Sequence, residues 1–120
     1  MKRLLLLTAL ITLATSSLAD ARIKIKGRGN NMNFDPESVG TSFRPSLDLM
    51  TRKCTKCHSM ELAVIAIQTG RAPITGQPFD RQAVRAYGIK MLRRTNSDMN
   101  KQEIREIVTL MNYLLDENKK

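Results

Sequence analysis

Apolar residues recur at helical spacing towards the end of the chain. Between Ile104 and Leu115 they follow an i, i+3, i+4, i+7 pattern, and Asn100 and Glu103 stand just before this stripe. An asparagine followed three residues later by a glutamate is typical of a capping box at a helix N-terminus. The pattern therefore predicts an amphipathic last helix that lays its apolar stripe on a core.

Two earlier segments also indicate helices. Ser46 directly follows Pro45 and is expected to cap a short helix that runs into a cluster of cysteines. The apolar segment 60–67 is expected to form a second helix that ends at Gly70, because glycine best tolerates the left-handed conformation that closes a helix.

A third helix is predicted to begin at Asp80. The Asp80 side chain can cap it, and Phe79 and Val84 occupy the two positions of a hydrophobic staple. One face of this helix carries Val84, Tyr87, Gly88 and Met91.

Residues 20–45 differ in character from the rest. They are rich in Gly, Asn, Ser and Pro and show no sustained period, which predicts an irregular N-terminal arm. The alternation over residues 22–26 would suit an edge strand, but a single strand has nothing to pair with. We therefore expect an all-α fold of three to four helices, formed by residues 46–120.

The first residues have the pattern of a secretory signal peptide. Lys2 and Arg3 precede an apolar run over residues 4–14, and small residues follow at Ala19 and Ala21. The run is shorter than the ~20 residues that span a bilayer. We expect residues 1–19 to be removed, with cleavage after Ala19 or Ala21, and the mature protein to be periplasmic with no integral membrane segment.

The charge indicates a class of partner. The chain has 20 basic and 11 acidic residues, and removal of residues 1–19 takes away two basic residues and no acidic one, which leaves a formal net charge of +7. Export and the few aromatic residues argue against nucleic acid. The excess suits either a solvated surface that keeps the protein soluble or attraction to a partner. We expect a monomer that meets acidic protein partners, with a docking face formed by Arg52, Lys53, Lys56, Lys90, Arg93 and Arg94.

The chemistry of the chain is concentrated in Cys54-Thr55-Lys56-Cys57-His58, which holds both cysteines and the only histidine. Cys-x-x-Cys-His is the pattern of covalent haem attachment. On a turn of helix, cysteines three apart project to one side and can each form a thioether to a porphyrin vinyl group, while the next residue brings its imidazole to the iron.

Other uses of the cluster remain open. A structural zinc site takes four ligands, and two cysteines and one histidine are too few. A Cys-x-x-Cys thiol-disulfide oxidoreductase is the stronger rival, although that chemistry usually sits where a strand of a thioredoxin-like sheet meets a helix. A structural disulfide would close too small a loop to stabilise much and would leave His58 without a role.

Residues 46–115 resemble a small bacterial monohaem c-type cytochrome. The shared order is a short helix, Cys-x-x-Cys-His, a loop with prolines, a helix bearing a methionine, and a terminal amphipathic helix containing "MNYLL". The resemblance implies a helical fold wrapped around one covalent haem c, attached at Cys54 and Cys57 and ligated by His58. It implies a carrier of single electrons, not an enzyme. It also places the carbonyl that accepts from His58 in the proline loop, at Pro73 or Pro78.

The sixth iron ligand is expected to be a methionine, because the chain has no second histidine. Met91 is the first choice, since Gly88 on the same face would let the backbone approach a flat ring. The resemblance supports it, because small bacterial cytochromes carry a methionine about eight residues before the terminal helix. Met99 is the second choice, because packing against Ile104 already accounts for it. Residues 90–98 lack the proline that often follows the ligand methionine in better-known cytochromes c, and Met99 therefore stays in consideration.

Two further expectations concern the haem. Tyr87 would either reach a haem propionate or lie in the core. The alternative function is a haem-based sensor of small ligands, in which the methionine bond is weak or absent and the sixth position is open.

Overall fold

Four α-helices make up most of residues 23–120, the part of the chain that the computed structural model describes. The expected signal peptide and its two cleavage positions lie outside the described residues. The helices are α1 (Arg44–Cys54), α2 (Glu61–Thr69), α3 (Arg81–Arg93) and α4 (Lys101–Asn118). The all-α prediction is therefore confirmed at the level of a mostly helical chain. Among the described helices, none has the length and apolar character to cross a membrane.

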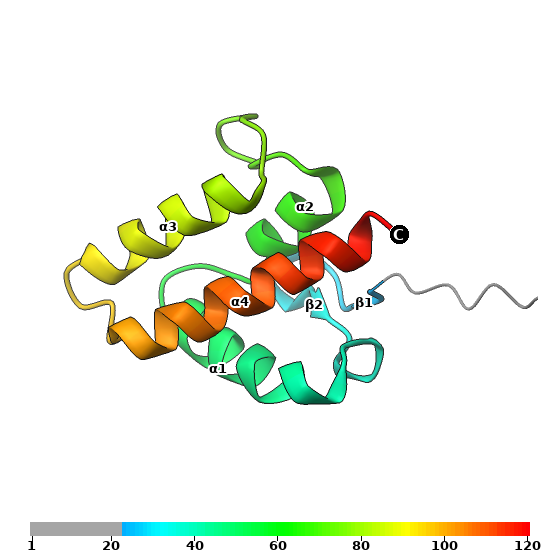
Figure 1. The fold of residues 1–120 in the computed structure, drawn as a ribbon, viewed down its shortest axis with the longest axis horizontal. Helices are drawn as coiled ribbons and strands as arrows, with labels where there is room; N and C mark the ends of the chain where they lie inside the picture. The colour runs from blue at the N-terminus through cyan, green and yellow to red at the C-terminus, as the bar shows by residue number, and fades with distance from the viewer. Residues whose placement is uncertain (1–22) are drawn as a thin grey trace, which may run out of the picture.

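The last helix is the centre of the fold. Helix α4 packs against α1, α2 and α3, and Figure 1 shows it running between α3 and α1. Its apolar stripe explains this position, because Ile107, Leu110 and Leu114 are at most 1% exposed. Burying such side chains contributes about 1.5–3 kcal/mol each relative to leaving them in water.

Three predicted helix ends are confirmed. At the start of α4 the Asn100 side chain accepts from the Glu103 backbone N–H at 2.8 Å, and the Glu103 carboxylate accepts from the Asn100 N–H at 3.2 Å. At the start of α3 the Asp80 carboxylate accepts from the Ala83 N–H at 2.9 Å. Helix α2 ends at Gly70, whose φ of 68° lies in the left-handed region.

The predicted cap of the first helix is wrong. Helix α1 begins at Arg44, so Ser46 lies inside its first turn, and Phe43 occupies the cap position without a side-chain hydrogen bond. Pro45 explains the difference, because proline suits the first turn, where its missing N–H has no acceptor to lose.

We expect Asn100→Ala to lower the free energy of unfolding by about 1 kcal/mol, because the substitution leaves the Glu103 N–H without its acceptor. Urea unfolding followed by circular dichroism measures the loss. Lys101→Ala is the matched control, since Lys101 is exposed in the same turn and makes no side-chain hydrogen bond among residues 23–120. Equal losses in the two variants would show that the cap does not stabilise α4.

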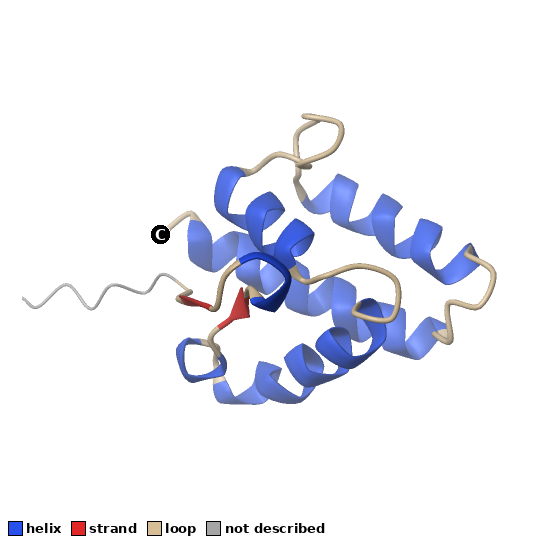
Figure 2. Cartoon of the chain, turned by 180° about the vertical axis from the view of Figure 1, so that it is seen from behind, coloured by secondary structure: helices blue, strands red, loops and turns tan. Residues whose placement is uncertain are grey.

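The N-terminal arm is more ordered than its composition predicts. Strand β1 (Ile25–Lys26) pairs antiparallel with β2 (Asn33–Phe34), with Ile25 opposite Phe34. The 3-10 turns η1 (Gly29–Asn31), η2 (Pro36–Ser38) and η3 (Thr41–Phe43) complete the arm. In Figure 2 the two strands lie between α1 and α2, in front of α4.

Apolar anchors hold the arm against the helices. Phe34 and Val39 are 1% and 2% exposed and belong to the core. The Gly40 N–H donates to the Tyr113 hydroxyl at 2.9 Å, and Phe43 stacks on the Tyr113 ring with centroids 4.1 Å apart. The arm is therefore in contact with the helices of residues 46–120: Phe34 and Val39 belong to the same core, and Phe43 packs against it.

Candidate functional site

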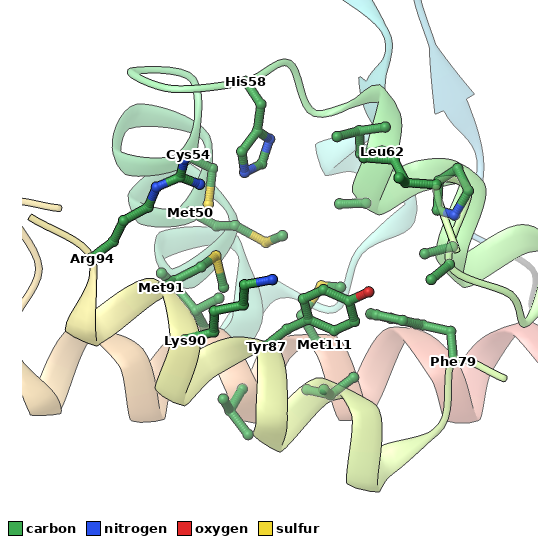
Figure 3. A pocket seen from close by; sticks show the side chains of 18 residues that line it. Met50, Cys54, His58, Leu62, Phe79, Tyr87, Lys90, Met91, Arg94 and Met111 are labelled. Carbon is green, nitrogen blue, oxygen red and sulfur yellow. The ribbon is translucent and has the colours of Figure 1, made fainter. Parts of the chain in front are cut away.

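An apolar pocket lies beside the cysteine cluster. Helix α1 and the turn after it form one wall, α2 and the 72–79 loop a second, and α3 a third, with side chains of α4 behind. The cavity volume is about 260 Å³. The residues that matter for its chemistry are Cys54, His58, Tyr87, Lys90, Met91 and Arg94 (Figure 3).

The two cysteines lie in different environments. Both thiols are free; Cys54 is buried and lines the pocket, whereas Cys57 is exposed and does not line it. Helical spacing predicted that both cysteine side chains would project from one side of a helical turn. Helix α1 ends at Cys54, so Cys57 lies in the following turn, where helical spacing no longer applies.

His58 points into the pocket from that turn (Figure 3). Its Nδ1 lies 2.9 Å from the carbonyl oxygen of Ser59. A carbonyl only accepts, so Nδ1 carries a proton. In the neutral imidazole the lone pair is then on Nε2, which is the tautomer that ligates a metal through Nε2. The expected carbonyl from the proline loop is not used, because Ser59 supplies it. Pro73 lines the cavity and Pro78 does not.

The pocket separates the two candidate methionines. Met91 projects from α3 into the cavity on the side away from His58 (Figure 3). Met99 does not line the cavity and packs instead against the buried core. Met50 and Met111 also line the cavity, but both are buried in the core, at 3% and 6% exposure.

Tyr87 and Gly88 have different surroundings although they are neighbours in α3. Tyr87 lines the pocket, and its ring lies 5.8 Å from that of Phe79. Gly88 faces α4 instead, because a Cβ built on it would lie 2.8 Å from Val108 Cγ2 and 3.4 Å from Ile104 Cγ2. The expectation that Gly88 admits a flat ring is corrected: it allows close approach of two helices.

Burial changes the acidity of Cys54. Desolvation, with a smaller contribution from nearby Cys57, raises the pKa of its thiol from 9.0 to about 11. The group therefore stays protonated and neutral at physiological pH, as expected for a thiol in an apolar cavity.

We expect iodoacetamide to modify Cys57 much faster than Cys54 in the folded chain without cofactor. A pKa near 11 leaves Cys54 about 100-fold less thiolate at pH 8 than a thiol with the ordinary value of 9.0, and the thiolate is the reacting form. Mass spectrometry of tryptic peptides measures both rates. In urea the rates should converge, and equal rates without urea would contradict the burial of Cys54.

Several basic side chains near the cysteine cluster already form ion pairs with carboxylates. Lys53 lies 3.4 Å from the Asp98 carboxylate and 3.6 Å from that of Glu103, and Lys56 also contacts Asp98. These ammonium groups, Lys56 first, hold the pKa of Asp98 below its usual value. These ion pairs connect the turn at residues 55–58 to the loop between α3 and α4.

The remaining basic residues of the expected docking face differ from these. Arg52 pairs with Asp48 at 3.0 Å. Within residues 23–120, Lys90, Arg93 and Arg94 form no ion pair, and Lys90 and Arg94 line the pocket. The uncompensated positive charge near the pocket is therefore on the last turn of α3.

Sequence reasoning missed the second wall of the pocket. Leu62 and Ala66 of α2 and Ala72 of the following loop line the cavity. The segment 60–67 is apolar almost throughout, so its periodicity did not indicate which face meets the pocket. On α3 a signal was available, because Val84, Tyr87, Met91 and Arg94 are spaced by three and four and all line the cavity.

Comparison with known proteins gave no relative. No protein-family model matches the chain, and neither a curated protein nor a solved structure matches it significantly. Within the described residues, no three His, Cys, Asp or Glu side chains come together as a metal site. The donors gathered at the pocket are instead one imidazole, one buried thiol and thioether sulfurs.

Proposed function

We propose that the chain is an exported monohaem c-type cytochrome that carries single electrons between protein partners. One observation carries the proposal: Cys54 and His58 of a Cys-x-x-Cys-His motif line the same apolar pocket as Met91. A covalently attached haem c supplies an iron that accepts and releases one electron, and the chain's residues attach it, ligate it and exclude water.

The donor set fits this group. Cys54 and Cys57 are free thiols and are available for thioether bonds. His58 presents Nε2 to the pocket because Nδ1 donates to Ser59, and a hydrogen bond at the other ring nitrogen is the usual support for a ligating histidine. Met91 would be the sixth ligand, a soft sulfur that favours the reduced iron. Met99 stays the second choice.

The polarity of the pocket suits a haem, but its volume must increase to hold one. Its walls are mostly apolar side chains, which suits a large aromatic ring. Its volume of about 260 Å³ is just below the ~300–1,000 Å³ usual for ligand sites. Attachment must therefore move the walls apart, and the cofactor would then become part of the core of this small domain.

The thiol-disulfide oxidoreductase is disfavoured by the state of Cys54. In that chemistry the first cysteine of the motif usually attacks, and its pKa is lowered, typically at a helix N-terminus. Cys54 is the last residue of α1, and its pKa is raised to about 11. The helix dipole at a C-terminus also opposes a thiolate.

The haem-based sensor would need an open sixth position. Met50, Met91 and Met111 all line the pocket (Figure 3), so it holds several sulfur donors that would compete with a small ligand. This arrangement favours the electron carrier, in which His58 and Met91 would both hold the haem iron.

Charge near the pocket supports acidic partners. Lys90 and Arg94 lie at the cavity and Arg93 beside it, each without an ion pair in the described chain. Such charges steer a partner of opposite sign towards the pocket, and their effect weakens with salt.

Absorption spectroscopy tests the proposal. The full chain is produced in a bacterial host with c-type haem maturation, and the exported protein is examined oxidised and reduced, with haem that survives denaturation scored as covalent. Covalent haem together with the far-red band of methionine sulfur on ferric iron is the expected result. Covalent haem without that band, and with carbon monoxide binding to the reduced protein, would favour the sensor. Absence of haem would overturn the proposal.

A further inference from the structure

A second concave surface lies on a different face of α3 from the pocket. It is an open groove of about 850 Å³ between α3 and α4. Arg81, Arg85 and Ile89 of α3 and Arg105 and Asn112 of α4 line it. Of all the residues that line the groove, only Val108 of α4 also lines the pocket beside His58, so the groove requires a separate explanation.

The groove is positively charged. Three arginines line it and no acidic residue does. Arg81 pairs with Asp116, whereas Arg85 and Arg105 form no ion pair within residues 23–120. Both side chains are exposed. A guanidinium presents paired donors that match a carboxylate or a phosphate, so the complementary ligand carries one of these anionic groups.

Two further observations favour a peptide over a simple anion. The Asn112 Oδ1 is buried and has no hydrogen-bond partner in the described chain. A buried acceptor is costly when unpaired. Once a bound partner displaces the atoms that cover this oxygen, a backbone N–H can satisfy it, whereas a carboxylate cannot. Ile89 is 42% exposed beside the arginines, which provides apolar contact for a side chain.

We propose that this groove binds an extended acidic segment of a partner protein. Carboxylates of the segment contact Arg85 and Arg105, a backbone N–H donates to Asn112 Oδ1, and an apolar side chain lies against Ile89. The groove and the pocket occupy different faces of α3, so a partner held here leaves the cysteine cluster free. The inference does not depend on the cofactor.

Fluorescence anisotropy at low salt tests the proposal with the exported, processed protein. The probe is a labelled eight-residue peptide of alternating glutamate and leucine, and its lysine–leucine counterpart is the control peptide. We expect Arg85→Glu/Arg105→Glu to weaken binding by about tenfold or more, since each reversal replaces an attraction with a repulsion. Arg28→Glu/Lys119→Glu changes net charge equally at exposed positions that do not line the groove and should leave binding within about twofold.

Asn112→Ala separates peptide recognition from general charge attraction. It leaves the net charge unchanged, and we expect binding to weaken by about threefold or more through loss of one hydrogen bond. Circular dichroism verifies that each variant is folded, and Arg85→Gln/Arg105→Gln replaces the reversal variant should that one fail to fold. Equal weakening by the two reversal variants, or no effect of Asn112→Ala, would overturn the proposal. Arginine-dependent binding to anionic phospholipid vesicles without binding to the peptide would also overturn it.

Discussion

Replacing Met91 with leucine is expected to abolish the far-red sulfur-to-iron band of the oxidised protein while covalent haem is retained. Leucine keeps the volume of the side chain that lines the pocket, so only the sulfur is lost. The reduction potential should fall by on the order of 0.1 V, a fraction of the ~0.8 V range that axial ligands control. Absorption spectra and a spectroelectrochemical titration measure the two effects.

Met99→Leu is the matched control, because Met99 packs against the core and does not line the pocket. It should retain both the band and the potential. Loss of the band in the Met99 variant and its retention in the Met91 variant would reverse the assignment. Retention in both would direct attention to Met50 and Met111, the other sulfurs at the cavity.

Gly88→Val is expected to lower the free energy of unfolding by about 1–3 kcal/mol, the usual cost of overfilling a packed interface. A Cβ at this position would lie 2.8 Å from Val108 Cγ2, and valine adds two methyl groups beyond it. Ala86→Val is the control, because Ala86 is exposed in the same helix and the change should cost only a few tenths of a kcal/mol. Urea unfolding measures both.

A double-mutant cycle shows which partner Gly88 meets. If the clash is with α4, Val108→Ala should recover part of the loss in the Gly88→Val background, because it removes the methyl group in the way. Additive losses, together with a changed haem spectrum in Gly88→Val, would instead place Gly88 against the cofactor, as the sequence alone suggested.

Helix ends were the most predictable part of this fold. Gly70, Asp80 and the Asn100–Glu103 pair each end or begin a helix through a local interaction. Such interactions depend on residues a few positions apart, so a single sequence contains the necessary information. Pro45 misled the same reasoning, because it suits the first turn of a helix as well as the residue before one.

The arm was less predictable because its contacts are distant in sequence. Phe34 and Val39 are isolated apolar residues among Gly, Asn and Ser, and no period reveals that both are buried. Gly40 is held by Tyr113, 73 positions away. Tertiary contacts of this kind decide whether a polar, glycine-rich segment is ordered, and local propensity does not report them.

The site was predictable where one motif contained it. Cys54 and His58 are four positions apart in the chain and line one pocket, and the stripe on α3 brought Met91 there. Gly88 was misassigned because helical spacing groups it with Val84 and Met91, whereas its contacts are with α4. Periodicity indicates only approximately which side of a helix a residue faces. That precision is too low for α3, which has the pocket on one side and α4 on another.

The unequal exposure of the two cysteines constrains the order of events in biogenesis. Cys54 is 4% exposed in the folded chain, so an enzyme that joins a cofactor to both thiols cannot reach it once α1 has packed. On the proposed function, attachment at Cys54 must precede completion of the core. Folding and maturation then compete in time after export, and a chain that folds first must reopen before it can be modified.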